Sequence, residues 1–153
     1  MVSNSQREPL CYRHVEVDSR YEIVGRFPVQ EGITPLPGCY YFARDPKGRL
    51  IKVEYRIGGH IAKDTNLELA RIIIEYSGEY EKRIYQNVRG MPTANDKTVY
   101  SIRLKMDDRG RRISLFNYDK EGNLVPDRNG VAQYLWSLDD TGRRVKSMRL
   151  DAN

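Results

Sequence analysis

A short motif that occurs twice limits most strongly how this chain can fold. The segment DDRGRR at residues 107–112 returns as DDTGRR at residues 139–144, an offset of 32 positions. Gly90 and Gly122 are separated by the same interval. Self-similarity at a fixed period is typical of a repeated supersecondary unit. We interpret this unit as a β-hairpin followed by a loop.

The pattern Asp-x-x-Gly has the chemistry of a tight turn between two strands. At residues 45–48, the Asp45 side chain can accept a hydrogen bond from a nearby backbone amide, and Pro46 presets the φ angle that the turn needs. Gly48 can take the left-handed conformation that closes the loop as a bulge, where another residue would cost about 1–2 kcal/mol. The motif therefore predicts hairpin turns, and its arginines begin the outgoing strands.

Alternating apolar and polar residues on both sides of these turns predict strands with one buried face. We expect an all-β fold, an antiparallel up-and-down meander of consecutive β-hairpins with about ten strands, as a curved sheet or an open or closed barrel. The chain reads as one all-β domain, residues 1–153. Within it, residues 1–37 hold an N-terminal hairpin and a connection rich in proline and glycine, and residues 38–153 hold the hairpin repeats.

Residues 66–76 fit two secondary structures. The pattern Thr65-Asn66-Leu67-Glu68 is a capping box, which would start a helix. Against this, Ile72-Ile73-Ile74 is a β-branched run, and Ser77-Gly78 fits a tight hairpin turn. We expect a strand here, with a helix as the alternative.

Strict alternation also assigns the side chains of the C-terminal hairpins to two faces. One face is apolar and includes Ile102, Leu104 and Trp136. The other is a candidate basic binding face, which carries Arg103, Lys105, Arg112, Phe116, Arg144 and Lys146. Only 39% of the residues are apolar, so the core has to come from this patterning. The apolar face needs a cover, which is another sheet, closure into a barrel, or a second copy of the chain.

Two cysteines and two histidines offer little for a metal site. Cys11 and Cys39 lack the close spacing of zinc ligands, and His14 and His60 are far apart in the sequence. We therefore predict that the chain binds no metal. We expect the cysteines to be two buried free thiols, with a disulfide between them as the alternative in an oxidising compartment.

The sequence contains no motif with a known catalytic mechanism. A glycine-rich phosphate loop, HExxH and GxSxG are all absent. His14 lies in an alternating strand and His60 in a loop, and neither has a placed carboxylate or nucleophile beside it. The acidic pairs at residues 107–108 and 139–140 lack the dense carboxylates of a calcium loop. We predict a protein that is not an enzyme, with no catalytic, cofactor-binding or metal-binding residues and no cofactor.

Three segments resemble a known repeat family. YDKEGNLV at residues 118–125 and LDDTGRRV at residues 138–145 resemble the tyrosine–aspartate (YD/RHS-like) repeat, and FARDPKGRL at residues 42–50 is similar to it. The resemblance covers about residues 38–153. It implies a bacterial β-hairpin repeat protein without catalytic residues, and it favours the cell envelope or secretion over the cytoplasm. The last residues, RLDAN, resemble the start of a further turn, so we expect either a natural chain that continues or a vestigial turn.

Three functions fit these features. We expect first a module for protein interaction or scaffolding, which binds a protein partner or itself as a homodimer, because the repeat comes without catalytic chemistry. A carrier of small hydrophobic ligands is an alternative if the strands close into a barrel with a lumen. Nucleic-acid binding through the basic face is a second alternative, supported by the net charge of +5. No apolar run is long enough to cross a bilayer, so we expect no membrane span.

Overall fold

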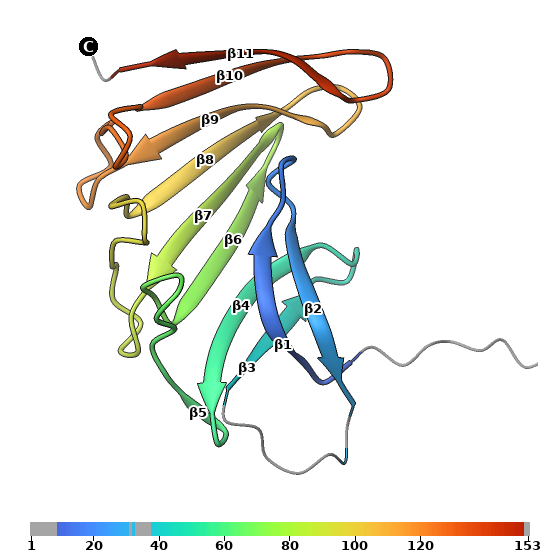
Figure 1. The fold of residues 1–153 in the computed structure, drawn as a ribbon, viewed down its shortest axis with the longest axis vertical. Helices are drawn as coiled ribbons and strands as arrows, with labels where there is room; N and C mark the ends of the chain where they lie inside the picture. Colours follow the sequence, from blue (N-terminus) through green and yellow to red (C-terminus); the bar gives the residue numbers. More distant parts are fainter. Residues whose placement is uncertain (1–8, 31, 33–37, 152–153) are drawn as a thin grey trace, which may run out of the picture.

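The protein forms one antiparallel β-sheet whose strands follow one another in a meander (Figure 1). The computed structural model describes residues 9–30, 32 and 38–151. Its strands are β1 (Cys11–Val17), β2 (Ile23–Val29), β3 (Cys39–Arg44), β4 (Leu50–Ile57), β5 (His60–Ile61), β6 (Arg71–Ser77), β7 (Tyr80–Gln86), β8 (Ser101–Met106), β9 (Arg112–Tyr118), β10 (Gln133–Leu138) and β11 (Arg144–Leu150). Their order is β11-β10-β9-β8-β7-β6-β4-β3-β1-β2, and β5 pairs with β4. The predicted all-β meander is confirmed, as a sheet that does not close into a barrel.

Two details of the predicted strands change. The strand expected within residues 66–76 is confirmed from Arg71 onward, and the helix alternative is wrong. β5 is an extra short strand in a stretch where the sequence predicts a loop. Gly58 and Gly59 both have positive φ angles, which let the chain turn back directly onto β4. The predicted connection between β2 and β3 falls mostly on residues 33–37, which lie outside the described residues.

Eight turns of the described chain share one hydrogen-bond pattern. In each, the side chain of the first residue accepts hydrogen bonds from the backbone amides two and four residues later, and the fourth residue has a positive φ angle. The first residues are Asp18, Asp45, Asn87, Asn95, Asp107, Asp119, Asp127 and Asp139. Glycine is the fourth residue in six of them. The intervals 87–119, 95–127 and 107–139 are all 32 residues, so the sequence repeat is a repeat of turns.

Thr98 is the fourth residue of the Asn95 turn, a position that glycine holds in six other turns, and its φ angle is 69°. A residue with a Cβ costs about 1–2 kcal/mol in this left-handed region, and glycine loses about 0.5–1 kcal/mol of backbone entropy on folding. We expect Thr98→Gly to raise the free energy of unfolding by about 0.5–1 kcal/mol in denaturant titrations. Thr98→Ala keeps the Cβ and should change this free energy little. An equal gain from both variants would contradict the explanation.

Three hairpins, β3–β4, β8–β9 and β10–β11, carry a β-bulge at the same place after the turn. The bulged residues are Ile51, Ile113 and Val145. In the β8–β9 hairpin, Lys105 pairs with Ser114 but Met106 pairs with Arg112, which leaves Ile113 without a partner. A bulge shifts the alternation of side chains by one residue, so the residue before it faces the other side of the sheet.

The bulges move two of the predicted basic-face residues to the apolar side of the sheet. Arg112 bonds to the buried Glu81, and Arg144 lies over the ring of Trp136. The faces predicted for Arg112 and Arg144 by strict alternation are therefore wrong. The position of a bulge depends on how the two strands pair, which the sequence of one strand does not show. We call the apolar side of the sheet the covered face, and the opposite side, which carries Arg103, the open face.

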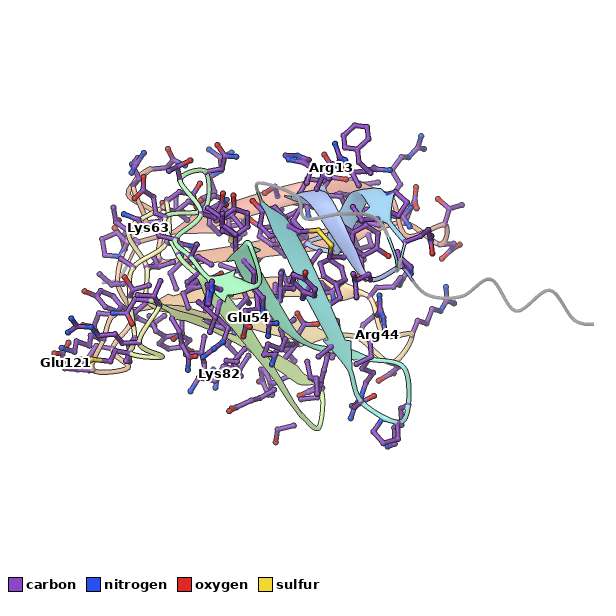
Figure 2. All side chains as sticks on the ribbon, turned by 90° about the horizontal axis from the view of Figure 1, so that it is seen from below. Arg13, Arg44, Glu54, Lys63, Lys82 and Glu121 are labelled. Atoms are coloured by element: carbon purple, nitrogen blue, oxygen red, sulfur yellow. A yellow bond between two sulfur atoms is a disulfide. The ribbon has the colours of Figure 1, made fainter. Side chains whose placement is uncertain are left out.

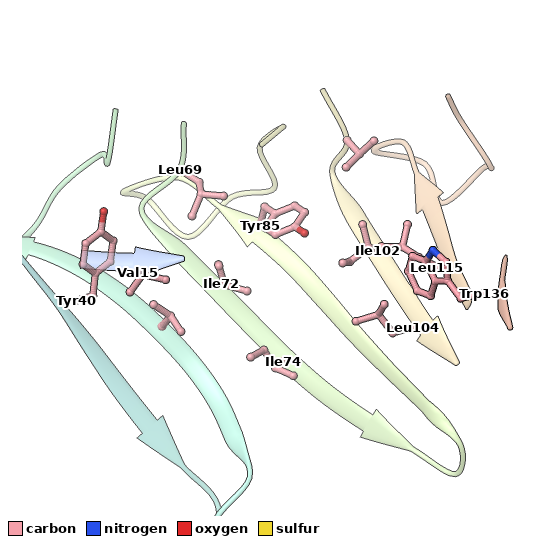
Figure 3. Packing of buried hydrophobic residues seen from close by; sticks show 12 residues of the cluster. Val15, Tyr40, Leu69, Ile72, Ile74, Tyr85, Ile102, Leu104, Leu115 and Trp136 are labelled. Atoms are coloured by element: carbon pink, nitrogen blue, oxygen red, sulfur yellow. The ribbon is translucent and has the colours of Figure 1, made fainter. Parts of the chain in front are cut away.

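The covered face packs against the chain's own N-terminal hairpin. Figure 1 shows β1 and β2 lying in front of β3 and β4, with their turn directed toward β7 and β8. Val15 of β1 joins the buried cluster that includes Ile72, Leu104 and Trp136 (Figure 3). Each such buried side chain stabilises the fold by about 1.5–3 kcal/mol. The cover that the apolar face needs is thus the first hairpin of the same chain, which strand alternation did not predict.

A disulfide ties this hairpin to the sheet. Among the described residues, β1 pairs with β3 at one position, Tyr12 with Tyr40. The neighbouring Cys11 and Cys39 are bonded to each other, with their Cα atoms 5.9 Å apart (Figure 2). The expectation of two free thiols is therefore wrong. The cysteines meet because β1 lies between β2 and β3 in the sheet, and the local sequence does not encode that order.

Candidate anion-binding cleft

A cavity of about 760 Å³ lies between three turns, those that join β1 to β2, β8 to β9 and β10 to β11. Five arginines and one carboxylate line it. They are Arg20, Glu22, Arg111, Arg112, Arg143 and Arg144. We call this cavity the arginine cleft. Because the first hairpin has to fold over the sheet before its turn reaches the other two, no single segment of the sequence forms the cleft.

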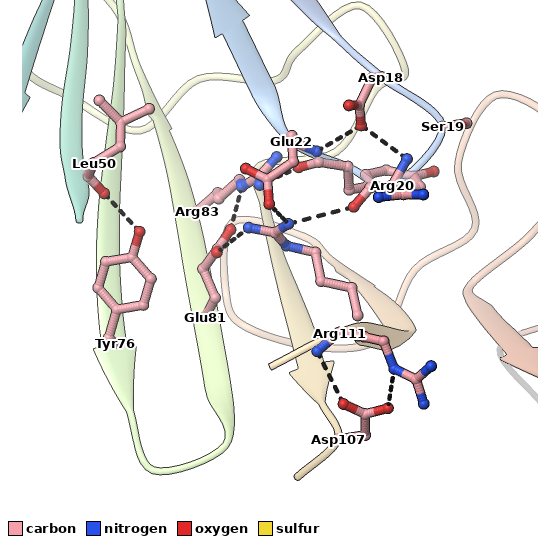
Figure 4. Close-up of polar contacts among 12 residues, drawn as sticks. Asp18, Ser19, Arg20, Glu22, Leu50, Tyr76, Glu81, Arg83, Asp107 and Arg111 are labelled. Carbon is pink, nitrogen blue, oxygen red and sulfur yellow. Dashed lines mark hydrogen bonds and ion pairs between the residues drawn. The ribbon is translucent and has the colours of Figure 1, made fainter. Parts of the chain in front are cut away.

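Both copies of the repeated motif supply arginines to the cleft. In the first copy, Arg111 Nε donates a hydrogen bond to Asp107 Oδ2 at 2.8 Å (Figure 4). Arg111 Nη1 also donates to the carbonyl oxygen of Asp139 at 2.9 Å, which joins the two turns. In the second copy, Arg143 Nε lies 3.3 Å from Asp139 Oδ2. The aspartates therefore shape the turns and also hold the arginines along the cleft wall.

Hydrogen bonds lower the pKa of both of these aspartates. The backbone amide of Arg111 is the main cause that lowers the pKa of Asp107 below its usual value. The hydroxyl of Thr141 is the main cause that lowers the pKa of Asp139. Each of these two carboxylates is therefore an ionised partner of one arginine.

A buried network of ion pairs fixes Arg112 between the cleft and the core. Its Nη2 lies 2.7 Å from Glu81 Oε1, and its Nη1 lies 2.5 Å from Glu22 Oε1. Arg83 Nε donates to Glu81 at 2.6 Å, and Arg83 also donates to the carbonyl oxygen of Tyr21 (Figure 4). Burial is the largest single influence and lowers the pKa of Arg112, but the charges and hydrogen bonds of Glu81 and Glu22 together outweigh it and raise this pKa above its usual value. Arg112 is therefore a permanent cation.

Arg144 connects the cleft to the core through Trp136. Its guanidinium carbon lies 4.1 Å from the centre of the Trp136 ring, and its Nη2 donates to the carbonyl oxygen of Ser19 at 2.6 Å. The Tyr21 ring also packs on Trp136, with ring centres 5.1 Å apart. Tyr21 is the fourth residue of the Asp18 turn and has a φ angle of 60°, which is strained for a residue other than glycine. This strained backbone carries the Tyr21 ring that packs on Trp136 beside the cleft.

The cleft combines fixed and accessible guanidinium groups. Arg112 is largely buried and already bonded to two carboxylates. Arg143 is 82% exposed, and its bond to Asp139 uses Nε, so its two amino groups remain accessible. Arg20 is exposed on the β1–β2 turn. Guanidinium groups bind carboxylates and phosphates through paired hydrogen bonds, so the accessible groups suit an anionic ligand.

The six residues predicted to form a basic face do not lie together. Four of them stay on the open face, namely Arg103, Lys105, Phe116 and Lys146. The guanidinium of Arg103 lies over the rings of Tyr80, Phe116 and Tyr118, at 4.6, 5.1 and 5.7 Å from their centres. These rings therefore pack on a side chain of the protein itself, whereas a nucleic-acid surface offers its aromatic rings to bases.

The two histidines lie on different strands. His14 is exposed in β1, and His60 is exposed in β5. Across residues 9–30, 32 and 38–151, no three His, Cys, Asp or Glu side chains are grouped so that they could hold a metal ion. Within the same ranges, no helix has the length and apolar character needed to cross a membrane. That the protein is not an enzyme and needs no cofactor stays a prediction.

The arginine cleft is not predictable from strand alternation, which places Arg112 and Arg144 on the wrong face. One signal for it does exist in the sequence, because both copies of the motif carry two arginines at the same distance from the turn aspartate. Arg20 and Glu22 have no such signal, since they reach the cleft only when the first hairpin folds over the sheet.

No protein-family model matches this sequence, and no curated protein matches it significantly. The resemblance of the turns to YD/RHS-like repeats therefore stays a prediction. The function has to be argued from the arginine cleft itself.

Proposed function

We propose that this protein is a non-enzymatic interaction module, which binds an acidic segment of a partner protein in the arginine cleft. One observation carries the proposal, the convergence of five arginines from three turns on one cavity with a single lining carboxylate, Glu22. The cavity volume of about 760 Å³ lies within the range of about 300–1,000 Å³ that ligand pockets have.

The distribution of the arginines favours a polypeptide over a compact ion. The guanidinium groups come from the turns that start at Asp18, Asp107 and Asp139 or from the first residue of the strand that follows, and each turn is anchored by its own hydrogen bonds. A polypeptide segment carries several carboxylates spaced along its length, so it can meet arginines from several turns at once. Arginine pairs with carboxylates in two parallel hydrogen bonds, which adds geometric specificity to the attraction between charges.

Neither alternative function gains a supporting observation. A carrier of hydrophobic ligands requires a lumen, and the sheet is not closed into a barrel. Two cavities of about 70 and 410 Å³ lie between the first hairpin and the covered face. The larger one is lined by the charged side chains of Glu22, Arg49, Glu81, Arg83 and Arg112, which do not suit a hydrophobic ligand. Nucleic-acid binding was based on a continuous basic face, and two of the residues assigned to that face line the cleft instead. Homodimer formation stays a prediction.

Arg143→Gln tests the proposal, because this side chain is exposed and lies in the cleft. We expect it to weaken the binding of a fluorescent glutamate-rich peptide about tenfold, since a hydrogen-bonded charge pair contributes about 1.5–3 kcal/mol. Fluorescence anisotropy at low and high salt measures the affinity, and thermal unfolding checks that the fold is kept. Arg89→Gln is the matched control, an exposed arginine in the equivalent turn at Asn87. Equal losses in both variants would indicate attraction to net charge alone, and absence of binding at low salt would rule out the proposal.

A further inference from the structure

Among the described residues, β11 forms one edge of the sheet, and no strand pairs with its outer side. All seven residues of this strand are exposed, and β11 is the last strand in the order of the sheet. On its other side it pairs with β10 along its length, from Leu138 with Arg144 to Gln133 with Leu150. An exposed strand edge presents unpaired amide and carbonyl groups, which can pair with another polypeptide.

The direction of the free backbone groups follows from one hydrogen bond. The carbonyl oxygen of Leu150 accepts a hydrogen bond from the amide of Ala132 at 2.8 Å, so the backbone of Leu150 faces the strand before β11. In an antiparallel ladder this direction alternates from residue to residue. The amide and carbonyl groups of Ser147 and Arg149 therefore face away from β10 and are open to a further strand.

The two edges of the sheet differ in this respect. β2 is the strand at the opposite edge, and it contains Pro28, which has no amide hydrogen, next to Phe27 with a φ angle of 54°. Proline and a local kink are common protections of a strand edge. β11 has the sequence RVKSMRL, without proline or glycine. Regular pairing with an added strand is therefore possible at β11 and obstructed at β2.

The side chains of β11 indicate the chemistry of the strand that would dock there. Arg144, Lys146 and Arg149 are cationic, and β11 has no acidic residue. Two copies of this edge would bring six cations together, whereas an acidic strand would neutralise them. Met148 and Leu150 are exposed and share the open-face side of the strand, so the docked segment also needs apolar residues on that side. Lys146 lies on the same side as Met148 and Leu150, whereas Arg149 lies on the covered-face side. The occupant is therefore acidic opposite Arg149 and Lys146, and apolar opposite Met148 and Leu150.

We infer that the edge of β11 is a docking surface on which an extended acidic segment of the partner protein adds an antiparallel strand. The inference rests on the proposed function for the sign of the partner's charge, and it adds the way in which the partner binds. Arg144, the first residue of β11, also lines the arginine cleft, so a strand on this edge leads directly into the cleft. Strand addition supplies affinity through the backbone, and the side chains supply specificity.

A peptide with alternating glutamate and valine, capped at both ends, is the probe for this inference. Its glutamates can face Arg149 while its valines face Met148 and Leu150. Two N-methylated versions of the same peptide are the matched controls. Each carries methyl groups on the backbone amide nitrogens of one of its two edges. Only one of the two versions therefore loses the amides that donate hydrogen bonds to β11. We expect calorimetric affinity to fall at least about tenfold for that version, because each lost hydrogen bond contributes about 1 kcal/mol.

Amide hydrogen exchange measured by NMR locates the contact. We expect the unmodified peptide to slow exchange at Ser147 and Arg149, while Met148, already bonded toward β10, changes little. Binding that depends on Arg143 but is indifferent to both methylated peptides and leaves these amides unchanged would overturn strand docking and keep the cleft. Protection at β11 without any effect of Arg143→Gln would support strand docking and reject the cleft. If exchange at these amides slowed when the protein concentration was raised without peptide, a second copy of the chain would be the occupant. If the peptide did not bind at all, both proposals would be overturned.

Discussion

Replacing Glu81 by alanine is expected to lower the free energy of unfolding by about 3–5 kcal/mol, because it leaves buried positive charge without a partner. Glu81 is 1% exposed and bonds to both Arg83 and Arg112. Arg83 is 3% exposed and lies on the covered face, where water cannot replace the lost carboxylate. The same change loosens the β1–β2 turn, since Arg83 donates to the carbonyl oxygen of Tyr21 from its position beside Glu81.

Urea titration followed by circular dichroism measures this loss, and two further variants interpret it. Glu22→Ala removes the other carboxylate on Arg112, but Glu22 is 56% exposed, so we expect a loss of no more than about 1 kcal/mol. The double variant Glu81→Leu with Arg83→Met replaces the buried pair by apolar side chains, and it should recover much of the stability. If Glu81→Ala cost no more than Glu22→Ala, the buried network would not be a main support of the fold.

Loss of the Cys11–Cys39 disulfide is expected to lower the free energy of unfolding by about 3–4 kcal/mol, from the loop entropy that the bond removes in the unfolded chain. The bond closes a loop between residues 28 positions apart. The loss of stability should be concentrated on the first hairpin, because in the described residues Tyr12 and Tyr40 are the one pair that joins β1 to β3. A loosened hairpin would expose the covered face that it packs on.

Trp136 reports on this change directly, because it is the one tryptophan of the chain and the Tyr21 ring packs on it. We expect a reducing agent to lower the melting temperature and to shift the tryptophan emission to longer wavelength as water reaches the ring. The double variant Cys11→Ser with Cys39→Ser should match the reduced protein and should not respond to the reducing agent. An unchanged melting temperature and emission on reduction would mean that the other contacts of the hairpin are sufficient.

The turns could be predicted because their interactions lie within a few residues. Asp107 accepts hydrogen bonds from the amides of Arg109 and Arg111, and Gly110 supplies the positive φ angle between them. All of these groups belong to one short segment, so the pattern Asp-x-x-Gly is enough to place the turn. The same reasoning explains why the strand after each turn could be predicted, including β6 from its β-branched residues.

The arginine cleft could not be predicted because it depends on which strands pair and in what register. Ile113 becomes a bulge only when Lys105 pairs with Ser114, and this bulge turns Arg112 toward Glu81. Reading the strand by strict alternation gives the opposite face. Arg20 lies more than a hundred positions before Arg143 in the sequence, and both line the same cavity only after the first hairpin folds over the sheet.

The sequence by itself determined the all-β fold, the positions of the turns and the hairpins that these turns join, since each depends on neighbouring residues or on a period of two along a strand. Only the tertiary structure decided that the first hairpin covers the apolar face, that Cys11 meets Cys39, and that Arg112 and Arg144 line a cleft. These features join residues that are distant along the chain. They depend on strand order, bulges and the path of the hairpin across the sheet, which act on the whole molecule and leave no local pattern to read.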